Sequence, residues 1–250
     1  MNLPGVYKFW LDQWKDFQTC WVISDTHFND EDLRKGHPTR ISDDDLVCAI
    51  NSKVGKRDIL FILGDVGDVS YLRKLRGYKI LIMGNHDAGA ENYERQYIGK
   101  KFDDAIYQRD EALLEMRRLY PDCNYTISHE WDVANALFSY WYVIADNNGC
   151  DMVISGPLTL GEKLILSHEP IPNLSWALNL HGHQHNGSVK QGLYHYNVCV
   201  DVMGPTPLNL NQFLKGGPTA HIQPLHRQII DTATARKARR GGKKIWEARK

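Results

Sequence analysis

The sequence lacks long hydrophobic runs and paired cysteines, and each absence excludes a class of protein. No apolar run approaches the roughly 18–20 residues that a transmembrane helix needs. The first residues, MNLPGVYKFWLDQWKDF, contain acidic and aromatic side chains where a signal peptide has an uninterrupted apolar stretch. The five cysteines are odd in number and form no CxxC pair, which argues against a disulfide framework or a zinc ribbon. We therefore expect a cytoplasmic protein with reduced thiols and no membrane span.

The sequence also lacks net charge, but its charges are unevenly distributed. It contains 30 Lys and Arg and 30 Asp and Glu. Residues 236–250, RKARRGGKKIWEARK, hold eight Lys or Arg and one Glu, a net of +7, so the rest of the chain carries −7. This basic tail has three interpretations: a solvated end, a weak contact with nucleic acid, or a tether to another acidic partner. The tail has only one aromatic residue, Trp246, which favours the solvated end over the nucleic-acid contact.

Apolar segments of strand length recur along the chain. They are nearly continuous rather than alternating, as expected for strands that are buried on both faces. A helix is predicted between the first two segments, with Ser42 as N-cap and Gly55 as the stop. Strands that alternate with helices indicate an α/β fold. The predicted strands are CWVIS (20–24), DILFIL (58–63), KILIM (79–83), KLILS (163–167), ALNL (177–180) and YNVCV (196–200).

The middle of the chain departs from this alternation. The sequence predicts a helix over 108–121 and strands over 139–145 and 152–167, the last of these interrupted by turn residues. Neither a repeat nor a low-complexity linker separates this part from the rest. We therefore predict one domain over residues 1–235, an elaborated segment at about 103–160, and the tail at 236–250. Beyond 215–218, a peripheral helix is expected to lead into the tail.

Five of the predicted strands are followed directly by polar side chains. Because parallel strands bring their carboxyl ends to one edge of a sheet, we expect these side chains to meet there. Asp, His and Asn without a thiolate suit Mn²⁺, Fe, Zn²⁺ or Ni²⁺. Seven such donors are too many for one ion and fit two ions about 4 Å apart, with one donor shared. The seven are Asp25, His27, Asp65, Asn85, His168, His183 and His185.

The order of these motifs resembles the calcineurin-like metallophosphoesterase superfamily. The series D-x-H, G-D-x-x-D, G-N-H-D, a lone His and G-H-x-H extends over residues 21–204. The resemblance implies a four-layer α/β/β/α sandwich with a dinuclear metal site at the carboxyl ends of the strands. It assigns Asp25, His27 and His185 to the first metal, Asn85, His168 and His183 to the second, and Asp65 to the bridge between them.

The resemblance also implies roles for two residues that bind no metal. His86 would act as general acid or phosphate-binding cation beside the leaving oxygen, and Asp68 would hydrogen-bond and orient it. A metal-activated hydroxide would attack the phosphorus. The family often has Arg after G-N-H-D, and this chain has Ala88 there, so a phosphate-contacting arginine is absent at that position.

Several other polar residues have simpler interpretations. Asp87 is expected to stabilise the turn, and His181 to pack within the strand. His129 in ISHEW competes with His168 in LSHEP for one metal position, and the apolar strand before His168 favours the latter. Four histidines without a matching context are assigned to the surface or to positions just outside the ligands: His37, His195, His221 and His226.

The predicted function is a dinuclear metal-dependent phosphoesterase, more specifically a phosphodiesterase on a nucleotide or small molecule, with Mn²⁺ as the expected ion. The alternatives are a phosphomonoesterase, a nuclease, or a non-catalytic protein-interaction scaffold of the same fold. The complete donor set favours an enzyme over the scaffold. Substrate specificity is expected from the segment 103–160 with its aromatics, although these could simply pack. The sequence leaves the oligomeric state open.

Overall fold

The computed structural model describes residues 19–132, 138–224 and 227–228 of the chain. His226 and the tail at 236–250 lie outside the described residues, as does most of the expected peripheral helix. Within the described part, no helix is both long and apolar enough to cross a membrane.

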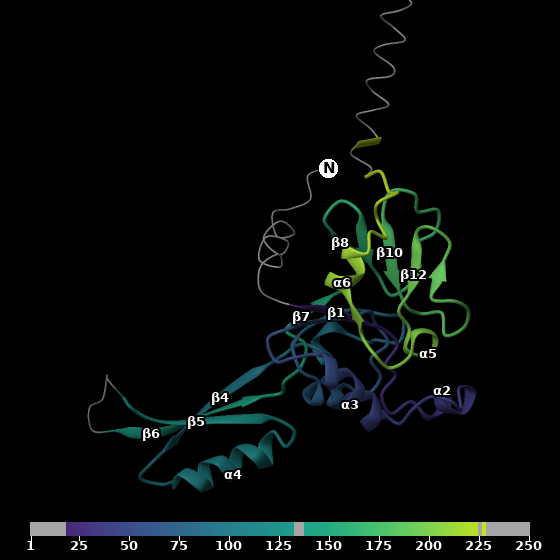
Figure 1. Ribbon diagram of the computed structural model, residues 1–250. Coiled ribbons are helices and arrows are strands. Elements are labelled where there is room, and N and C mark those ends of the chain that lie inside the picture. The colour runs from purple at the N-terminus through teal and green to yellow at the C-terminus, as the bar shows by residue number, and fades with distance from the viewer. Residues whose placement is uncertain (1–18, 133–137, 225–226, 229–250) are drawn as a thin grey trace, which may run out of the picture.

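Two five-stranded sheets form the body of the molecule (Figure 1). In the first sheet, β1, β2, β3 and β7 are parallel and β13 is antiparallel at the edge. In the second sheet, β9, β10 and β12 are parallel, with antiparallel β8 and β11 at the edges. The first sheet has the order β13 (Leu208–Asn209), β1 (Cys20–Ile23), β2 (Ile59–Ile62), β3 (Tyr78–Ile82) and β7 (Met152–Ile154). The second has the order β11 (Lys190–Gln191), β12 (His195–Asn197), β10 (Leu178–His181), β9 (Leu164–Leu166) and β8 (Leu158–Leu160).

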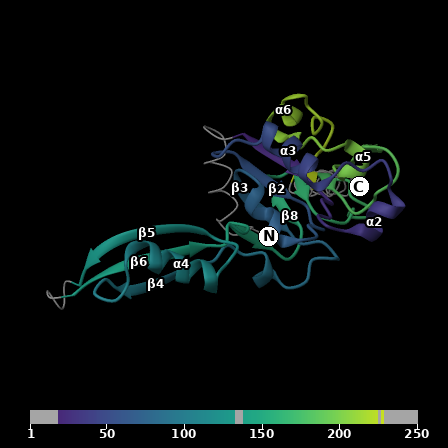
Figure 2. The same cartoon turned by 90° about the horizontal axis from the view of Figure 1, so that it is seen from below.

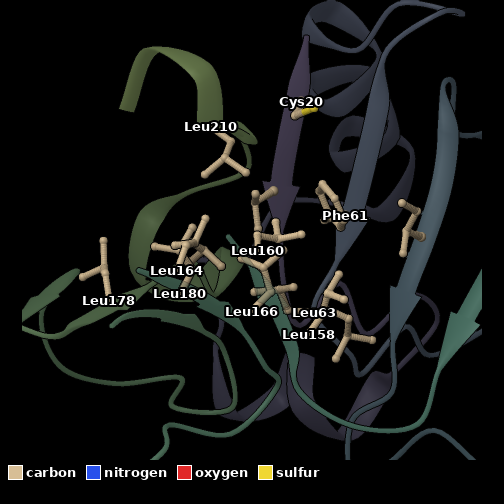
Figure 3. Close-up of a cluster of buried hydrophobic side chains, with 14 of the residues drawn as sticks. Cys20, Phe61, Leu63, Leu158, Leu160, Leu164, Leu166, Leu178, Leu180 and Leu210 are labelled. Atoms are coloured by element: carbon tan, nitrogen blue, oxygen red, sulfur yellow. The ribbon is translucent and has the colours of Figure 1, made fainter. Parts of the chain in front are cut away.

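The two sheets pack face to face and share one core. Phe61 of β2 and Leu63, which directly follows β2, lie in the same buried cluster as Leu166 and Leu180 from the second sheet (Figure 3). Leu60, the neighbour of Phe61 in β2, belongs to a different cluster on the opposite face of the first sheet. Both faces of β2 are therefore buried, which is why its sequence is apolar throughout.

Helix α3 (Asp43–Lys53) covers the outer face of the first sheet. The side chain of Ser42 accepts the N–H of Asp45 at 3.2 Å, as an N-cap does. Leu46 and Ile50 are fully buried against the sheet. The helix predicted from the sequence is confirmed, and so is the α/β sandwich. On the outer face of the second sheet, the loop 170–177 contributes the buried side chains that pack on it.

A third sheet projects from the body and carries one helix (Figures 1 and 2). Phe102, Val143 and Met116 form the centre of its small core. Arg95 connects this extension to the body, because its guanidinium forms ion pairs with Asp146 of the extension and with Asp151 beside β7. The extension consists of β4 (Tyr97–Asp103), α4 (Arg109–Leu119), β5 (Asn124–Trp131) and β6 (Ser139–Asp146), with strand order β4-β6-β5. It overlaps the segment expected at 103–160, and the single-domain assignment of residues 1–235 stays a prediction.

The remaining short elements connect these layers. The strand predicted over 196–200 is shorter than expected, because the side-chain oxygen of Asn197 accepts the N–H of Cys199 at 2.9 Å and the chain turns into a helix. These elements are α2 (Glu31–Gly36), η1 (Val69–Lys74), η2 (Ala90–Asn92), α5 (Val200–Met203) and α6 (Leu210–Lys215).

Candidate metal centre

Polar side chains from both sheets converge where β1, β2, β3, β9 and β10 end. Donor atoms of Asp25, His27 and His185 lie within 4.8 Å of one another, and so do those of Asp25, Asp65 and His168. Asp25 is fully buried, and Asp65 is 1 % exposed. The sequence assigned these residues to one edge of the sheet, and the structure brings them together there.

Asp65 lies between the two groups. Its Oδ2 is 3.5 Å from Nε2 of His27 and 3.3 Å from Nε2 of His168. Its other oxygen, Oδ1, accepts the backbone N–H of His86 at 3.0 Å. One carboxylate oxygen thus faces a histidine of each predicted metal position, which is the arrangement that a bridging ligand requires.

The three residues assigned to the second metal also meet. Nε2 of His168 is 2.7 Å from Oδ1 of Asn85 and 3.2 Å from Nδ1 of His183. Nδ1 of His183 is in turn 3.0 Å from Oδ1 of Asn85. The three donor atoms therefore point into a common space.

Three histidines of the centre are held by an oxygen at Nδ1. Nδ1 of His168 is 2.9 Å from the carbonyl oxygen of Leu63, which is a pure acceptor. Nδ1 of His27 is 3.0 Å from the Asp30 carboxylate, and Nδ1 of His185 is 2.7 Å from the Asp201 carboxylate. An acceptor at Nδ1 keeps the proton there and leaves the lone pair of Nε2 for a metal.

The residues present fit a pair of divalent cations. Nε2 of His27 is buried and has no hydrogen-bond partner among the described residues. A buried nitrogen without a partner is energetically unfavourable unless another group binds it, and a metal ion would bind this one. The donors are carboxylates, one amide oxygen and imidazoles, which suit borderline divalent ions.

The protonation of Asp65 and His27 is coupled. Burial on its own raises the pKa of Asp65, but the imidazoles of His27 and His168 beside it and the N–H of His86 hold the pKa below its ordinary value. Burial lowers the pKa of His27, but the carboxylates of Asp65 and Asp25 outweigh this effect and raise it. The carboxylates of Asp65 and Asp25 therefore favour a positive charge beside them, so protons and metal ions compete for this site.

The backbone around these side chains is held in an uncommon conformation. Asp25, His27, Asp65 and His183 have φ values of 58°, 39°, 53° and 65°. L-residues with side chains seldom adopt this left-handed region, and such positions cluster at functional sites.

Two glycines allow the close approach of the loops. A Cβ on Gly182 would lie 2.1 Å from a carboxylate oxygen of Asp25, and a Cβ on Gly84 would lie 2.2 Å from one of Asp65. Both glycines directly precede predicted ligands in the sequence, and the absence of a Cβ allows the backbone to approach the carboxylates there.

Asp87 stabilises two of the loops that carry the predicted ligands. Its carboxylate accepts the backbone N–H groups of Asp65 at 2.9 Å, Gly84 at 2.8 Å and Val66 at 3.0 Å. It is 8 % exposed. It thereby connects the loop after β2 with the loop after β3, in agreement with the structural role predicted for it.

The two predicted catalytic residues have different surroundings. The ring centroid of the exposed His86 is 5.6 Å from that of His27. The Asp68 carboxylate accepts the N–H of Ser70 at 2.9 Å and so caps η1. Within the described part of the chain, no hydrogen bond joins Asp68 to His86, and the orienting role of Asp68 stays a prediction.

The other histidines take different positions. His129 lies in the extension, with Nε2 2.7 Å from the Asp104 carboxylate, so it is not part of the cluster. His181 is fully buried, and burial lowers its pKa. Its ring lies 5.7 Å from that of His195. The ring of His37 lies 5.6 Å from that of His185, so this residue is close to the centre.

Four residues of the surroundings were missed by the sequence analysis: Asp30, Arg40, Cys199 and Asp201. Arg40 donates to the Asp201 carboxylate and to the carbonyl oxygens of Asp25 and Thr26. Sγ of Cys199 is 3.8 Å from Nδ1 of His185, but burial raises the pKa of this thiol and keeps it protonated. Asp30 was detectable, since it lies three residues after His27 and caps α2. Arg40 and Asp201 belong to no local motif.

Comparisons with known proteins identify the fold family. The family model described as calcineurin-like phosphoesterase matches residues 19–198. The crystal structure of AQ665, a protein of unknown function from Aquifex aeolicus, aligns over 80% of this chain and 99% of its own with 19% identity and a TM-score of 0.46. A comparison with curated proteins finds no match.

Proposed function

Because the chain belongs to the calcineurin-like phosphoesterase family, we propose that it is a dinuclear metal-dependent phosphodiesterase acting on a nucleotide or another small diester. The family match supports metal-dependent hydrolysis of phosphoesters. The single observation that carries the dinuclear proposal is the position of Asp65 Oδ2 between Nε2 of His27 and Nε2 of His168.

The proposed ligands follow from the geometry of the donors. Asp25, His27 and His185 would hold one ion, Asn85, His168 and His183 would hold the other, and Asp65 would bridge them. Such ions neutralise phosphoryl oxygens and lower the pKa of water. We propose Mn²⁺ because the donors are predominantly oxygen and imidazole, with Fe, Zn²⁺ and Ni²⁺ as alternatives.

The chain's own residues would perform the remaining steps. The exposed imidazole of His86 would donate a proton to the leaving oxygen, and it lies beside His27 at the opening of the centre. The hydrogen bonds of Asp30, Asp201 and the Leu63 carbonyl would keep the ligand rings oriented.

Three further proposals concern the location of the protein, its partners and its catalytic competence. The cysteine pattern supports a cytoplasmic protein. The basic tail at 236–250 supports a weak contact with nucleic acid, although a solvated end requires no partner. The complete set of donors supports an enzyme rather than a non-catalytic scaffold.

The test is an activity screen of full-length protein loaded with Mn²⁺. Bis-p-nitrophenyl phosphate should be hydrolysed faster than p-nitrophenyl phosphate, and Asp65→Asn should abolish both activities. A preference for the monoester would favour the phosphomonoesterase alternative. Folded, metal-loaded protein that hydrolyses no phosphoester would refute the proposal.

A further inference from the structure

A pocket of about 370 Å³ opens beside the second proposed metal position. Asn85 and His168 line it, so it is continuous with the metal centre. Its other lining residues are Ile82 at the end of β3 and residues of the segments that follow β3, β7 and β9. The pocket thus lies at the carboxyl ends of strands from both sheets, where α/β folds bind ligands.

The lining indicates an uncharged occupant. Met83, Pro157, Ile171 and Pro172 contribute apolar surface, and no Lys or Arg is among the lining residues. Glu169 contributes the one acidic side chain. A further phosphate in this pocket, beyond the one at the metal centre, would meet the Glu169 carboxylate and no Lys or Arg side chain, which is unfavourable. A ring-bearing group with hydroxyl or amine donors would instead bury its apolar faces and donate to Glu169.

The pocket and His86 lie next to different proposed metal positions. His86 is not among the residues that line the pocket, and its ring lies beside His27 of the first proposed metal position. A phosphoryl group bound over Asp65 therefore has two separate places for ester substituents. A monoester has one substituent to place, and a diester has two.

We propose that this pocket binds the retained ester substituent of a phosphodiester, an uncharged ring-bearing group of nucleoside size, while the leaving group lies beside His86. This inference rests on the proposed phosphodiesterase function and names its substrate class. It assigns specificity to Met83, Glu169 and Ile171 of the body, not to the aromatics of the extension.

Gly156 offers a direct way to fill the pocket. It lines the pocket, a Cβ at this position would meet no atom within 4 Å, and its φ lies outside the left-handed region. Gly156→Phe should therefore occupy the pocket without disturbing the backbone. Gly36→Phe is the matched control, because Gly36 also has open space around its Cβ position and does not line the pocket.

Two substrates with the same leaving group separate the retained substituents. These are methyl p-nitrophenyl phosphate and the p-nitrophenyl ester of thymidine 5′-monophosphate. Gly156→Phe should lower kcat/KM for the thymidine ester by about tenfold or more, mainly through a higher KM. The reason is that the phenyl ring would occupy the space proposed for the nucleoside, and changes in the shape of an apolar pocket alter kcat/KM by about this much. Hydrolysis of the methyl ester should change by less than about twofold, and Gly36→Phe should change neither rate.

A second readout does not depend on turnover. Thymidine 5′-monophosphate, measured by calorimetry with the metal-loaded protein, should bind wild type and Gly36→Phe more tightly than Gly156→Phe. Metal content and circular dichroism should be the same in all three proteins. If Gly156→Phe does not fold, Ser155→Trp at the neighbouring exposed lining position takes its place.

The outcomes separate the two proposals. If both esters are hydrolysed and Gly156→Phe slows them equally or slows neither, the pocket assignment is wrong while the phosphodiesterase proposal stands. If no ester is hydrolysed, the proposed function is wrong, and nucleotide binding that is insensitive to Gly156→Phe would then refute the pocket as well.

Discussion

One oxygen of Asp201, Oδ2, contacts both Nδ1 of His185 at 2.7 Å and the guanidinium of Arg40. Arg40 also donates a hydrogen bond to the backbone carbonyl of Asp25. The buried Arg40–Asp201 ion pair therefore connects Asp25 with His185, two residues of the proposed first metal position. The pKa of Asp201 lies below its ordinary value, because the hydrogen bond with His185 and the charge of Arg40 outweigh the effect of burial. The carboxylate is therefore ionised and able to orient the imidazole.

Asp201→Asn should weaken metal binding by about 10–100-fold, as is typical when the partner of a ligating histidine is removed. Isothermal titration of metal-free protein with Mn²⁺ measures this change. Asp32→Asn is the matched control, since Asp32 is an exposed carboxylate on α2. Equal affinities of wild type and Asp201→Asn would contradict the orienting role.

His86→Ala should keep both metals and lower turnover of substrates with poor leaving groups by about 10²–10⁴-fold. Esters of p-nitrophenol should be affected less, because this leaving group needs no proton. Asp68→Asn should give a smaller loss in the same direction. Unchanged rates of His86→Ala on a nucleoside ester with an alkoxide leaving group would exclude it as the acid.

Asp87→Ala should destabilise the protein, because three backbone N–H groups would lose the carboxylate that accepts them. The expected loss of unfolding free energy is at least about 3 kcal/mol, given that each of the three buried donors left without a partner costs about 1–3 kcal/mol. Urea unfolding measures it. Asp44→Ala, which removes an exposed carboxylate that pairs with Lys74, should change stability by less than about 1 kcal/mol.

The ion pair of Asp146 with Arg95 predicts an acid-dependent loss of stability. Burial raises the pKa of Asp146, but the Arg95 hydrogen bond and the N–H of Asn148 outweigh it and hold the pKa below the ordinary value of 3.8. A lowered folded-state pKa adds stability that is complete above the unfolded-state value and is lost as pH falls through the folded-state value. Between about pH 5 and pH 2, the urea midpoint of wild type should therefore fall more steeply than that of Asp146→Asn. Parallel profiles would contradict this assignment.

The sequence predicted the parts of this structure that local patterns encode. Ser42 and Asp45 lie three residues apart, so the start of α3 was visible as an N-cap. The nearly continuous apolar residues of β2 correctly indicated a strand with two buried faces. The donors after each strand could be assigned to one edge because strand polarity alone brings them there.

The remainder depends on contacts between distant parts of the chain. Arg40 and Asp201 are 161 residues apart, and nothing near either residue marks the pair. The division of the strands into two sheets could not be read from apolar runs, since strands of either sheet look alike. The pocket at Gly156 combines segments after three strands, and only their packing forms it.

The metal content of the reconstituted protein tests the central claim most directly. Wild-type protein reconstituted with Mn²⁺ and freed of excess ion should contain two ions per chain by elemental analysis. His27→Ala should lose mainly one of them, whereas Asp65→Ala should lose both, because Oδ2 of Asp65 faces a histidine of each proposed position. One ion or none in wild-type protein, or two ions retained in Asp65→Ala, would contradict a dinuclear centre bridged by this carboxylate.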